Sequence, residues 1–171
     1  IYWTPSTGAF SVRGAIGQEW GRQGFERGPL GYPTGDEYKT PNKDGIVQPF
    51  QVGAMYYSPA TGARRVQGLI LGKYGQLGYE NSWLGFPVSN EMPVKDFGKF
   101  NEFQNGFIYW SPLSGAQAIH KGPIFDAYKA QGFENGRLGF PTTDEFPIPG
   151  GVQQNFQLGY ITLHGTTAEV H

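Results

Sequence analysis

The chain has 171 residues, of which 13 are Lys or Arg and 14 are Asp or Glu, so its formal net charge is only −1. This balance lacks the basic excess of a general nucleic-acid-binding protein, and no stretch approaches the roughly 18 apolar residues of a membrane-spanning helix. We therefore expect no nucleic-acid partner and no membrane insertion. With 27 Gly, 13 Pro and only 16% charged residues, the composition favours short strands and turns over long helices or coiled coils.

The sequence contains no cysteine, which excludes disulfides, thiolate catalysis and cysteine-based zinc sites. It begins at Ile1, without an initiator Met and without a basic segment followed by an apolar leader. We expect it to be a processed product or an excised piece of a longer protein.

A Leu-Gly-aromatic-Pro motif recurs along the chain every 54 residues, at positions 30–33, 84–87 and 138–141. A second block, Phe-Gln-x-Gly, begins at Phe50, Phe103 and Phe156. Self-similarity at a fixed period of this size is the signature of a tandem repeat protein.

Residues 1–12 contain Tyr-Trp-Thr-Pro, which lacks the Phe-Gln partner found upstream of its later counterparts. We predict an orphan strand pair from a preceding repeat there. A short helix is then predicted in each repeat, because Ile and an aromatic residue lie four positions apart shortly before a glycine. These pairs are Ile16 and Trp20, Ile70 and Tyr74, and Ile124 and Tyr128.

Further along the first repeat, residues 47–51, 55–57 and 63–66 predict an antiparallel meander. In the second repeat, Asn105 and Gly106 predict a two-residue hairpin turn. One helix and one small sheet bury little surface alone, so we expect adjacent repeats to share a core.

The predicted fold class is α+β. It is a tandem repeat of about 54 residues, each a short helix plus a small antiparallel sheet of three to four strands, stacked as a linear or curved array. The predicted boundaries are 1–12 for the orphan strand pair and 13–66, 67–119 and 120–171 for three repeats, the last a degenerate C-terminal cap. A closed ring like a β-trefoil is the alternative, and a helix in every unit argues against it.

Flat aromatic faces beside carboxylates or amides recognise sugars, so exposed aromatic residues are the first candidates for a binding site. Three of them hold the same strand position in successive repeats: Trp3, Tyr57 and Trp110. Since side chains alternate along a strand, the tyrosine before each of them must face the other way. The alternative is that both faces are packed, one on the helix and one on the adjoining repeat.

A pair of acidic or amide residues follows each Leu-Gly-aromatic-Pro motif: Asp36 and Glu37, Asn90 and Glu91, and Asp144 and Glu145. Hydrolysis of a glycosidic bond uses one unequal pair of carboxylates in a cleft. A pair that is repeated in every unit and amidated in one is instead typical of a shared binding or structural role. The Thr-x-x-Glu spacing that begins at Thr34 and Thr142 also matches a capping box, which predicts a cap or a turn.

Gln51 and Gln104, with Gln157 in the third repeat, are candidates either to bind sugar hydroxyls or to bond a nearby turn. Three glutamates, Glu26, Glu80 and Glu134, follow the predicted helices and are expected to accept backbone N–H groups of the next turn. The three histidines are far apart and lack any metal-ligand spacing. Phosphate loops, dinucleotide fingerprints and nucleophile elbows are absent from the sequence, so we predict no metal, no cofactor and no enzymatic activity.

The Leu-Gly-(Phe/Tyr)-Pro motif, the acidic pair after it and the Phe-Gln-x-Gly block together resemble the LGFP repeat family over nearly the whole chain. The departures are Tyr32 in place of Phe, Asn90 in place of Asp, and Tyr160-Ile161 in place of the aromatic pair. This family is known from actinobacterial cell-envelope proteins, where the repeats accompany mycoloyltransferases or cell-wall hydrolases. The resemblance implies a module that binds the peptidoglycan-arabinogalactan polymer.

We therefore predict a non-catalytic module that binds cell-wall polysaccharide and anchors an attached or partner enzyme. Its expected location is extracellular or in the cell envelope, and its expected partners are the polysaccharide and a covalently linked enzyme domain. A structural spacer or protein-interaction stalk without specific glycan binding is the alternative. A glycan hydrolase would need one repeat to hold a unique carboxylate pair in a deep cleft.

Overall fold

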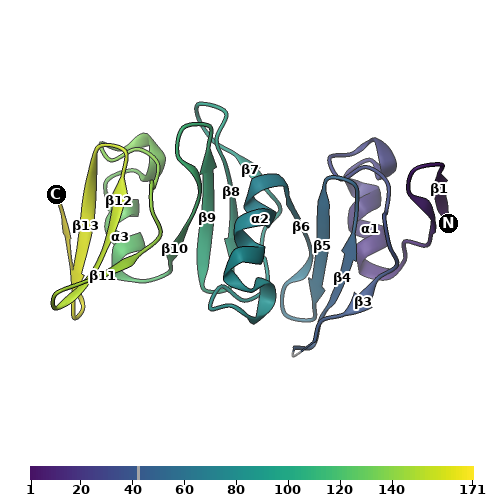
Figure 1. Ribbon diagram of the computed structural model, residues 1–171, viewed down its shortest axis with the longest axis horizontal. Helices are drawn as coiled ribbons and strands as arrows, with labels where there is room; N and C mark the ends of the chain where they lie inside the picture. The colour runs from purple at the N-terminus through teal and green to yellow at the C-terminus, as the bar shows by residue number, and fades with distance from the viewer. Residues whose placement is uncertain (42) are drawn as a thin grey trace.

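The computed structural model describes residues 1–41 and 43–171. Helices and small sheets alternate along the long axis, and the chain ends lie at opposite ends of the row (Figure 1). The predicted α+β class and the open stack of tandem repeats are confirmed, and the closed ring is wrong.

The elements repeat in the order helix, 3₁₀ turn and four strands. The first set is α1 (Gly14–Arg22), η1 (Phe25–Arg27), β3 (Tyr38–Lys39), β4 (Ile46–Pro49), β5 (Gly53–Ser58) and β6 (Gly62–Gln67). The second is α2 (Gly68–Leu77), η2 (Tyr79–Asn81), β7 (Met92–Pro93), β8 (Lys99–Phe103), β9 (Gly106–Ser111) and β10 (Gly115–His120). The third is α3 (Pro123–Ala130), η3 (Phe133–Asn135), β11 (Phe146–Ile148), β12 (Gly151–Phe156), β13 (Gly159–His164) and β14 (Thr167–Val170). A separate hairpin of β1 (Tyr2–Thr4) and β2 (Gly8–Phe10) precedes them.

Each four-stranded sheet is an antiparallel meander whose strands lie in chain order. In the second sheet Phe103 pairs with Gly106, so the central turn consists of Gln104 and Asn105. The predicted Asn105-Gly106 turn is therefore wrong by one residue. The reason is that the backbone N–H of Asn105 donates to the Leu84 carbonyl at 3.0 Å, which binds this turn to the Leu-Gly-aromatic-Pro segment.

The helices are packed on both sides, which is why adjacent repeats share a core. Tyr74 of α2 is fully buried and contacts Tyr56 of the sheet before it and Phe103 of the sheet after it, with ring centroids 5.4 and 4.6 Å apart. The expectation of a core shared between repeats is confirmed by this arrangement. Both faces of β5 and β9 are consequently covered by helices.

The Leu-Gly-aromatic-Pro motif joins each helix to its own sheet. Leu84 is fully buried, and the Tyr74 hydroxyl donates a 2.7 Å hydrogen bond to the Gly85 carbonyl. Gly85 has a φ of +74°, and an added Cβ would lie 2.5 Å from Oε1 of Gln104. Only glycine fits both this backbone conformation and this close approach. The same bond joins Tyr128 to Gly139 in the third repeat.

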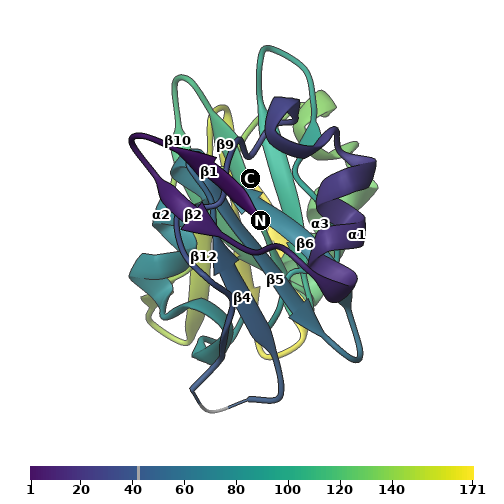
Figure 2. The same ribbon diagram turned by 90° about the vertical axis from the view of Figure 1, so that its right-hand side faces the viewer.

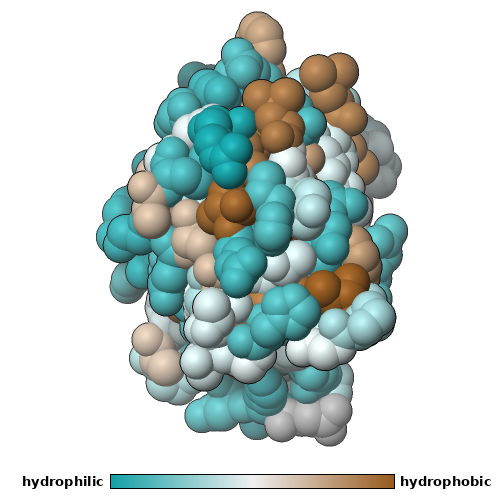
Figure 3. All heavy atoms as spheres, turned by 90° about the vertical axis from the view of Figure 1, so that its left-hand side faces the viewer, coloured by the Kyte–Doolittle hydropathy of each residue, from teal (hydrophilic) through white to brown (hydrophobic). Residues whose placement is uncertain are grey.

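In the first two sheets, one face packs against the helix of the next repeat. The equivalent face of the third sheet carries polar side chains. The strand register aligns Thr162-Leu163 with the aromatic pair Tyr109-Trp110, so the expected replacement by Tyr160-Ile161 is wrong by two residues. The Thr162 hydroxyl lies 3.0 Å from Nε2 of His171. Tyr160 stacks on the ring of His171 at a centroid distance of 4.6 Å. At this end of the molecule hydrophilic atoms predominate, and the apolar residues form separate small patches (Figure 3).

Candidate binding site at the junction of the first two repeats

The three strand aromatics that sequence reasoning singled out differ in exposure. Trp3 is 62% exposed on the β1–β2 hairpin, which lies outermost at the end of the molecule shown in Figure 2. Tyr57 is half-buried and packs on the core around α1, and Trp110 is half-buried and packs on the core around α2. The preceding Tyr56 and Tyr109 are buried as well, so the arrangement with both strand faces packed holds in these two repeats.

Asn90 and Asp144 lie between repeats and bond to the repeat before them. Asn90 Oδ1 accepts a 2.8 Å hydrogen bond from the backbone of β6, and Asp144 Oδ1 accepts one of 2.7 Å from the backbone of β10. Asn90 Nδ2 donates to Glu19 of α1 at 3.0 Å, whereas Asp144 forms an ion pair with Lys73 of α2. Asp36, at the corresponding position of the first repeat, is exposed.

The glutamates that follow these residues have separate surroundings. Glu37 accepts a 3.3 Å hydrogen bond from Nε of Arg13. Glu91 is partly buried, and this burial raises the pKa of its carboxyl even though Arg65 acts in the opposite direction. Glu145 lines a small cavity beside the start of α3. The structure thus places the acidic pairs at successive junctions and does not gather them in one cleft.

The capping-box interpretation of Thr34 and Thr142 is wrong. From these residues the chain continues into strands, β3 at Tyr38 and β11 at Phe146, and not into a helix. The backbone N–H groups of the two threonines donate to carbonyls of β4 and β12 at 3.0 and 2.9 Å. These bonds hold the segment extended along the sheet, which prevents a helical turn.

The Phe-Gln-x-Gly glutamines bond to the turn of the Leu-Gly-aromatic-Pro motif. Their side-chain oxygens accept the backbone N–H of the motif's aromatic residue, at 2.9 Å for Gln51, 2.9 Å for Gln104 and 3.0 Å for Gln157. Of the two roles considered from the sequence, the geometry places these oxygens in turn bonding.

A second set of amides, which sequence reasoning missed, holds adjacent repeats together. Gln48, Asn101 and Gln154 are fully buried. The side-chain nitrogen of each donates to a carbonyl of the preceding repeat, at 2.8, 3.0 and 2.8 Å, and to a loop carbonyl of its own repeat. The sequence signal was a side-chain amide that recurs every 53 positions, two residues before the Phe of each Phe-Gln-x-Gly block.

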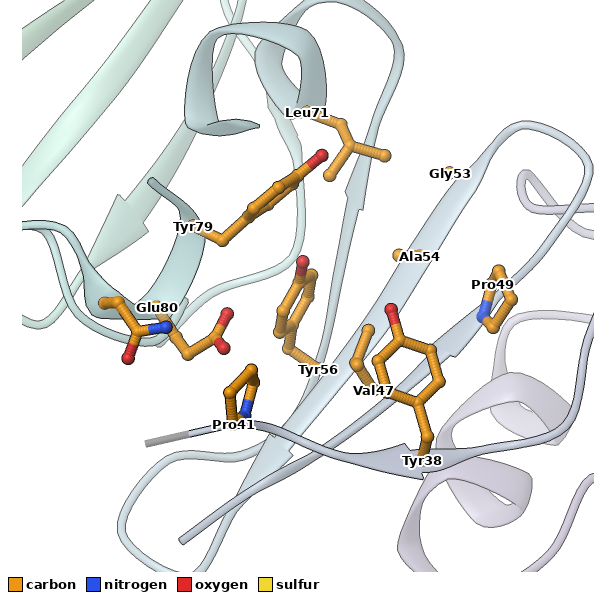
Figure 4. Close-up of a pocket in the computed structure, with 11 residues that line it drawn as sticks. Tyr38, Pro41, Val47, Pro49, Gly53, Ala54, Tyr56, Leu71, Tyr79 and Glu80 are labelled. Carbon is orange, nitrogen blue, oxygen red and sulfur yellow. The ribbon is translucent and has the colours of Figure 1, made fainter. Parts of the chain in front are cut away.

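A cavity of about 350 Å³ opens between the first sheet and the α2–η2 segment. Its walls include Tyr38 of β3, Tyr56 of β5 and both Tyr79 and Glu80 of η2, so it draws residues from two repeats. Figure 4 shows the three tyrosine rings around one space, with the Glu80 carboxylate directed towards Tyr56. Tyr38 and Tyr79 are 57% and 45% exposed, whereas Tyr56 and Glu80 are each only 4% exposed.

Packing fixes the cavity walls. Tyr79 lies edge-on to Tyr74 with ring centroids 5.7 Å apart, and its ring covers Gly75, where an added Cβ would lie 2.8 Å from the ring. Burial, with the charge of Glu80 second, raises the pKa of the Tyr56 hydroxyl well above its ordinary value. Tyr56 therefore remains a neutral hydroxyl at physiological pH.

The Glu80 carboxylate does not make the backbone bonds expected from the sequence. Within residues 1–41 and 43–171, no hydrogen bond or ion pair joins it to another group. Glu134, its counterpart in the third repeat, is also buried and accepts a 3.4 Å hydrogen bond from Asn135. The expectation fails because the 3₁₀ turn uses its own carbonyls to bind these N–H groups, as in the bond from Ser82 N to the Tyr79 carbonyl.

Aromatic side chains fill the corresponding space between the second and third repeats. Bulkier or purely apolar residues replace the cavity wall there: Met92 for Tyr38, Phe100 for Val47, Phe107 for Ala54, Phe125 for Leu71 and Phe133 for Tyr79. Phe107 stacks on Phe125 with ring centroids 4.1 Å apart. The cavity at the first junction thus depends on the small side chains of Ala54 and Leu71.

Comparison with known proteins agrees with the internal repeat. A family model described as the LGFP repeat matches four tandem segments, residues 1–28, 30–82, 84–136 and 138–171. No curated protein sequence matches the chain significantly. In the part of the chain that the structure describes, three or more His, Asp or Glu residues nowhere gather as a metal site, and no helix is long and apolar enough to cross a membrane. The matches cover almost every residue, and the chain belongs to the LGFP repeat family.

Proposed function

We propose that the chain is a non-catalytic module that binds cell-wall polysaccharide outside the cell and anchors an attached or partner enzyme. Membership of the LGFP family supports the broader assignment, a repeat module of cell-envelope-type proteins. The observation that carries the finer proposal is the cavity at the first junction. There the exposed rings of Tyr38 and Tyr79 offer flat apolar surface to a sugar, and the Glu80 carboxylate offers hydrogen-bond acceptors beside them.

The positions of the carboxylates support a binding role over hydrolysis. A glycosidase needs two carboxyl groups that flank one bond, about 5 to 9.5 Å apart. Asp144 is engaged by a backbone N–H and by Lys73, and Glu37 is engaged by Arg13. Among the residues that the structure describes, Glu80 is the single carboxylate of the cavity wall.

A spacer without specific glycan binding is the second candidate. It is favoured by the number of polar side chains that bond one repeat to the next, including Asn101 and Gln154. A rigid rod built in this way would hold an attached enzyme at a set distance from the wall.

Co-sedimentation with insoluble cell-wall polymer distinguishes the two candidates. The folded chain is mixed with wall material before and after chemical removal of the arabinogalactan, at low and high salt. The binding module should pellet with the intact wall at both salt concentrations, and Ala54→Phe, which closes the cavity, should reduce pelleting. Trp3→Ala tests the exposed strand aromatic in the same assay, and Tyr160→Ala serves as a control at the opposite end. A chain that stays in the supernatant under every condition favours the spacer.

A further inference from the structure

We propose that the cavity lined by Tyr38, Tyr56, Tyr79 and Glu80 binds a protonated primary amine, as carried by a de-N-acetylated hexosamine. The inference rests on the proposed function, because it names the group of the wall polymer that this cavity would hold. Three observations carry it: the state of the carboxylate, the arrangement of the rings, and the contrast with the second junction.

Glu80 supplies a charge without a counter-charge. Glu80 is only 4% exposed and lines the cavity. No cation of the described chain lies within ion-pair distance of its carboxylate. A carboxylate that has lost most of its contact with water is stabilised in its ionised form by a cation or by several hydrogen-bond donors. An ammonium group in the cavity would supply both at once, since it carries a positive charge and three N–H donors.

The tyrosine rings provide a second attraction for a positively charged ligand. The faces of tyrosine rings carry negative electrostatic potential and attract cations that lie within about 6 Å of the ring centre. Rings from β3, β5 and η2 surround one space, and the Glu80 carboxylate is directed into it (Figure 4). A neutral sugar would stack on the same rings but would leave the carboxylate uncompensated. The site therefore favours an amine over a hydroxyl of similar size.

The volume sets the scale of the ligand. At about 350 Å³ the cavity is at the lower end of the range for small-molecule sites, which suits one sugar residue or one amine-bearing side chain. Because Phe107 and Phe125 fill the second junction, we expect one amine site per chain and not one per repeat.

Isothermal titration calorimetry with four probes tests the inference: glucosamine, N-acetylglucosamine, glucose and Nα-acetyl-lysine amide. We expect glucosamine to bind with one site per chain and at least about tenfold more tightly than glucose or N-acetylglucosamine. Ala54→Phe, which copies the filled junction, should abolish this binding. Glu80→Gln should weaken it by at least about tenfold, because the amide keeps the shape and removes the charge. Glu134→Gln, the same change at the filled junction, should leave it unchanged.

The two amine sources are separated by the lysine probe. Equal binding of the lysine amide and glucosamine supports an ammonium site that also accepts peptide amines, whereas preference for glucosamine assigns the amine to a sugar. Thermal unfolding of each variant confirms that loss of binding is not loss of the fold; if Glu80→Gln unfolds, Ala54→Phe and Tyr79→Leu carry the test.

Failure of this inference is distinguishable from failure of the proposed function. Equal affinity for glucose and glucosamine would overturn the amine inference and still support glycan binding. Pelleting with the wall, combined with no heat from either amine probe, would overturn the inference and place glycan binding elsewhere on the chain. Amine binding without pelleting would support the site and contradict the wall-binding proposal.

Discussion

Asn90 donates a 3.0 Å hydrogen bond to Glu19, a residue of α1 that lies 71 positions earlier in the chain. Asp144 and Lys73, each 54 positions further along, meet in the same way and form an ion pair. The two contacts use equivalent positions with matched chemistry, an amide against Glu and a carboxylate against Lys. The side chain at position 90 or 144 therefore complements the charge of the helix residue that it contacts in the preceding repeat.

Exchanging the chemistry at this contact should change stability in a predictable way. Asn90→Asp places a second carboxylate beside Glu19, and we expect it to lower the free energy of unfolding by about 1–2 kcal/mol. Adding Glu19→Lys recreates the pair seen between Lys73 and Asp144 and should recover part of this loss. Urea unfolding of both single variants and the double variant gives the coupling energy. Additive effects of the two substitutions would contradict direct recognition between these positions.

The pH dependence of stability should contain a contribution from Glu19. Burial alone would raise its pKa, but hydrogen bonds from Gln23 and Asn90 and the charges of Arg22 and Arg64 lower it below 4.5. A carboxyl with a lowered folded pKa stabilises the fold above its unfolded pKa, and this contribution is lost as the pH falls through the folded value.

Urea unfolding of the unmodified chain and of Glu19→Gln measures this contribution. The unmodified chain should be the more stable at about pH 7, and the difference should shrink towards about pH 3. Other titrating groups are common to both proteins and cancel in the comparison. A difference that grows on acidification would show that the carboxyl is not stabilised by its neighbours.

The buried amides should contribute strongly to the contact between repeats. Gln154→Leu removes two donated hydrogen bonds of 2.8 Å and leaves the carbonyls of Ala118 and Thr143 without this partner. We expect a loss of about 2–3 kcal/mol in the free energy of unfolding. Gln153→Leu, next to it on the opposite strand face, is the matched control and should change stability by less than about 1 kcal/mol. Equal effects of the two substitutions would argue against a special role for the buried amide.

Alanine substitution of two glycines in the same repeat should change the stability of the fold in opposite directions. Gly85→Ala forces a Cβ to within 2.5 Å of Gln104 at a φ of +74°, and we expect a loss of at least about 2 kcal/mol. Gly72 lies within α2 with no atom within 4 Å of an added Cβ, so Gly72→Ala should raise stability by roughly 0.5–1 kcal/mol. Thermal and urea unfolding measure both. A stable Gly85→Ala protein would show that the Leu-Gly-aromatic-Pro turn tolerates another backbone.

Much of the fold was predictable from the sequence because it depends on local chemistry. The helices around Ile16, Ile70 and Ile124 and the meander strands follow from short-range patterns, and the 54-residue period identified the tandem array. The capping-box interpretation failed because backbone bonds to the neighbouring strand outweighed a local side-chain pattern. The first strand of each sheet, as short as the two residues of β3, was too brief to leave a pattern of its own.

The candidate site was not predictable in the same way. Tyr38, Ala54 and Tyr79 are far apart in the sequence and meet only where one sheet faces the next helix. Alternation along β5 did not indicate the exposed face, because helices cover both sides of the sheet. The period, the turn motif and the absence of cysteine chemistry were thus determined by the sequence itself. The tertiary structure decided which aromatic residues are exposed and where a cavity remains. The reason is that side chains from two repeats together fill the space at each junction.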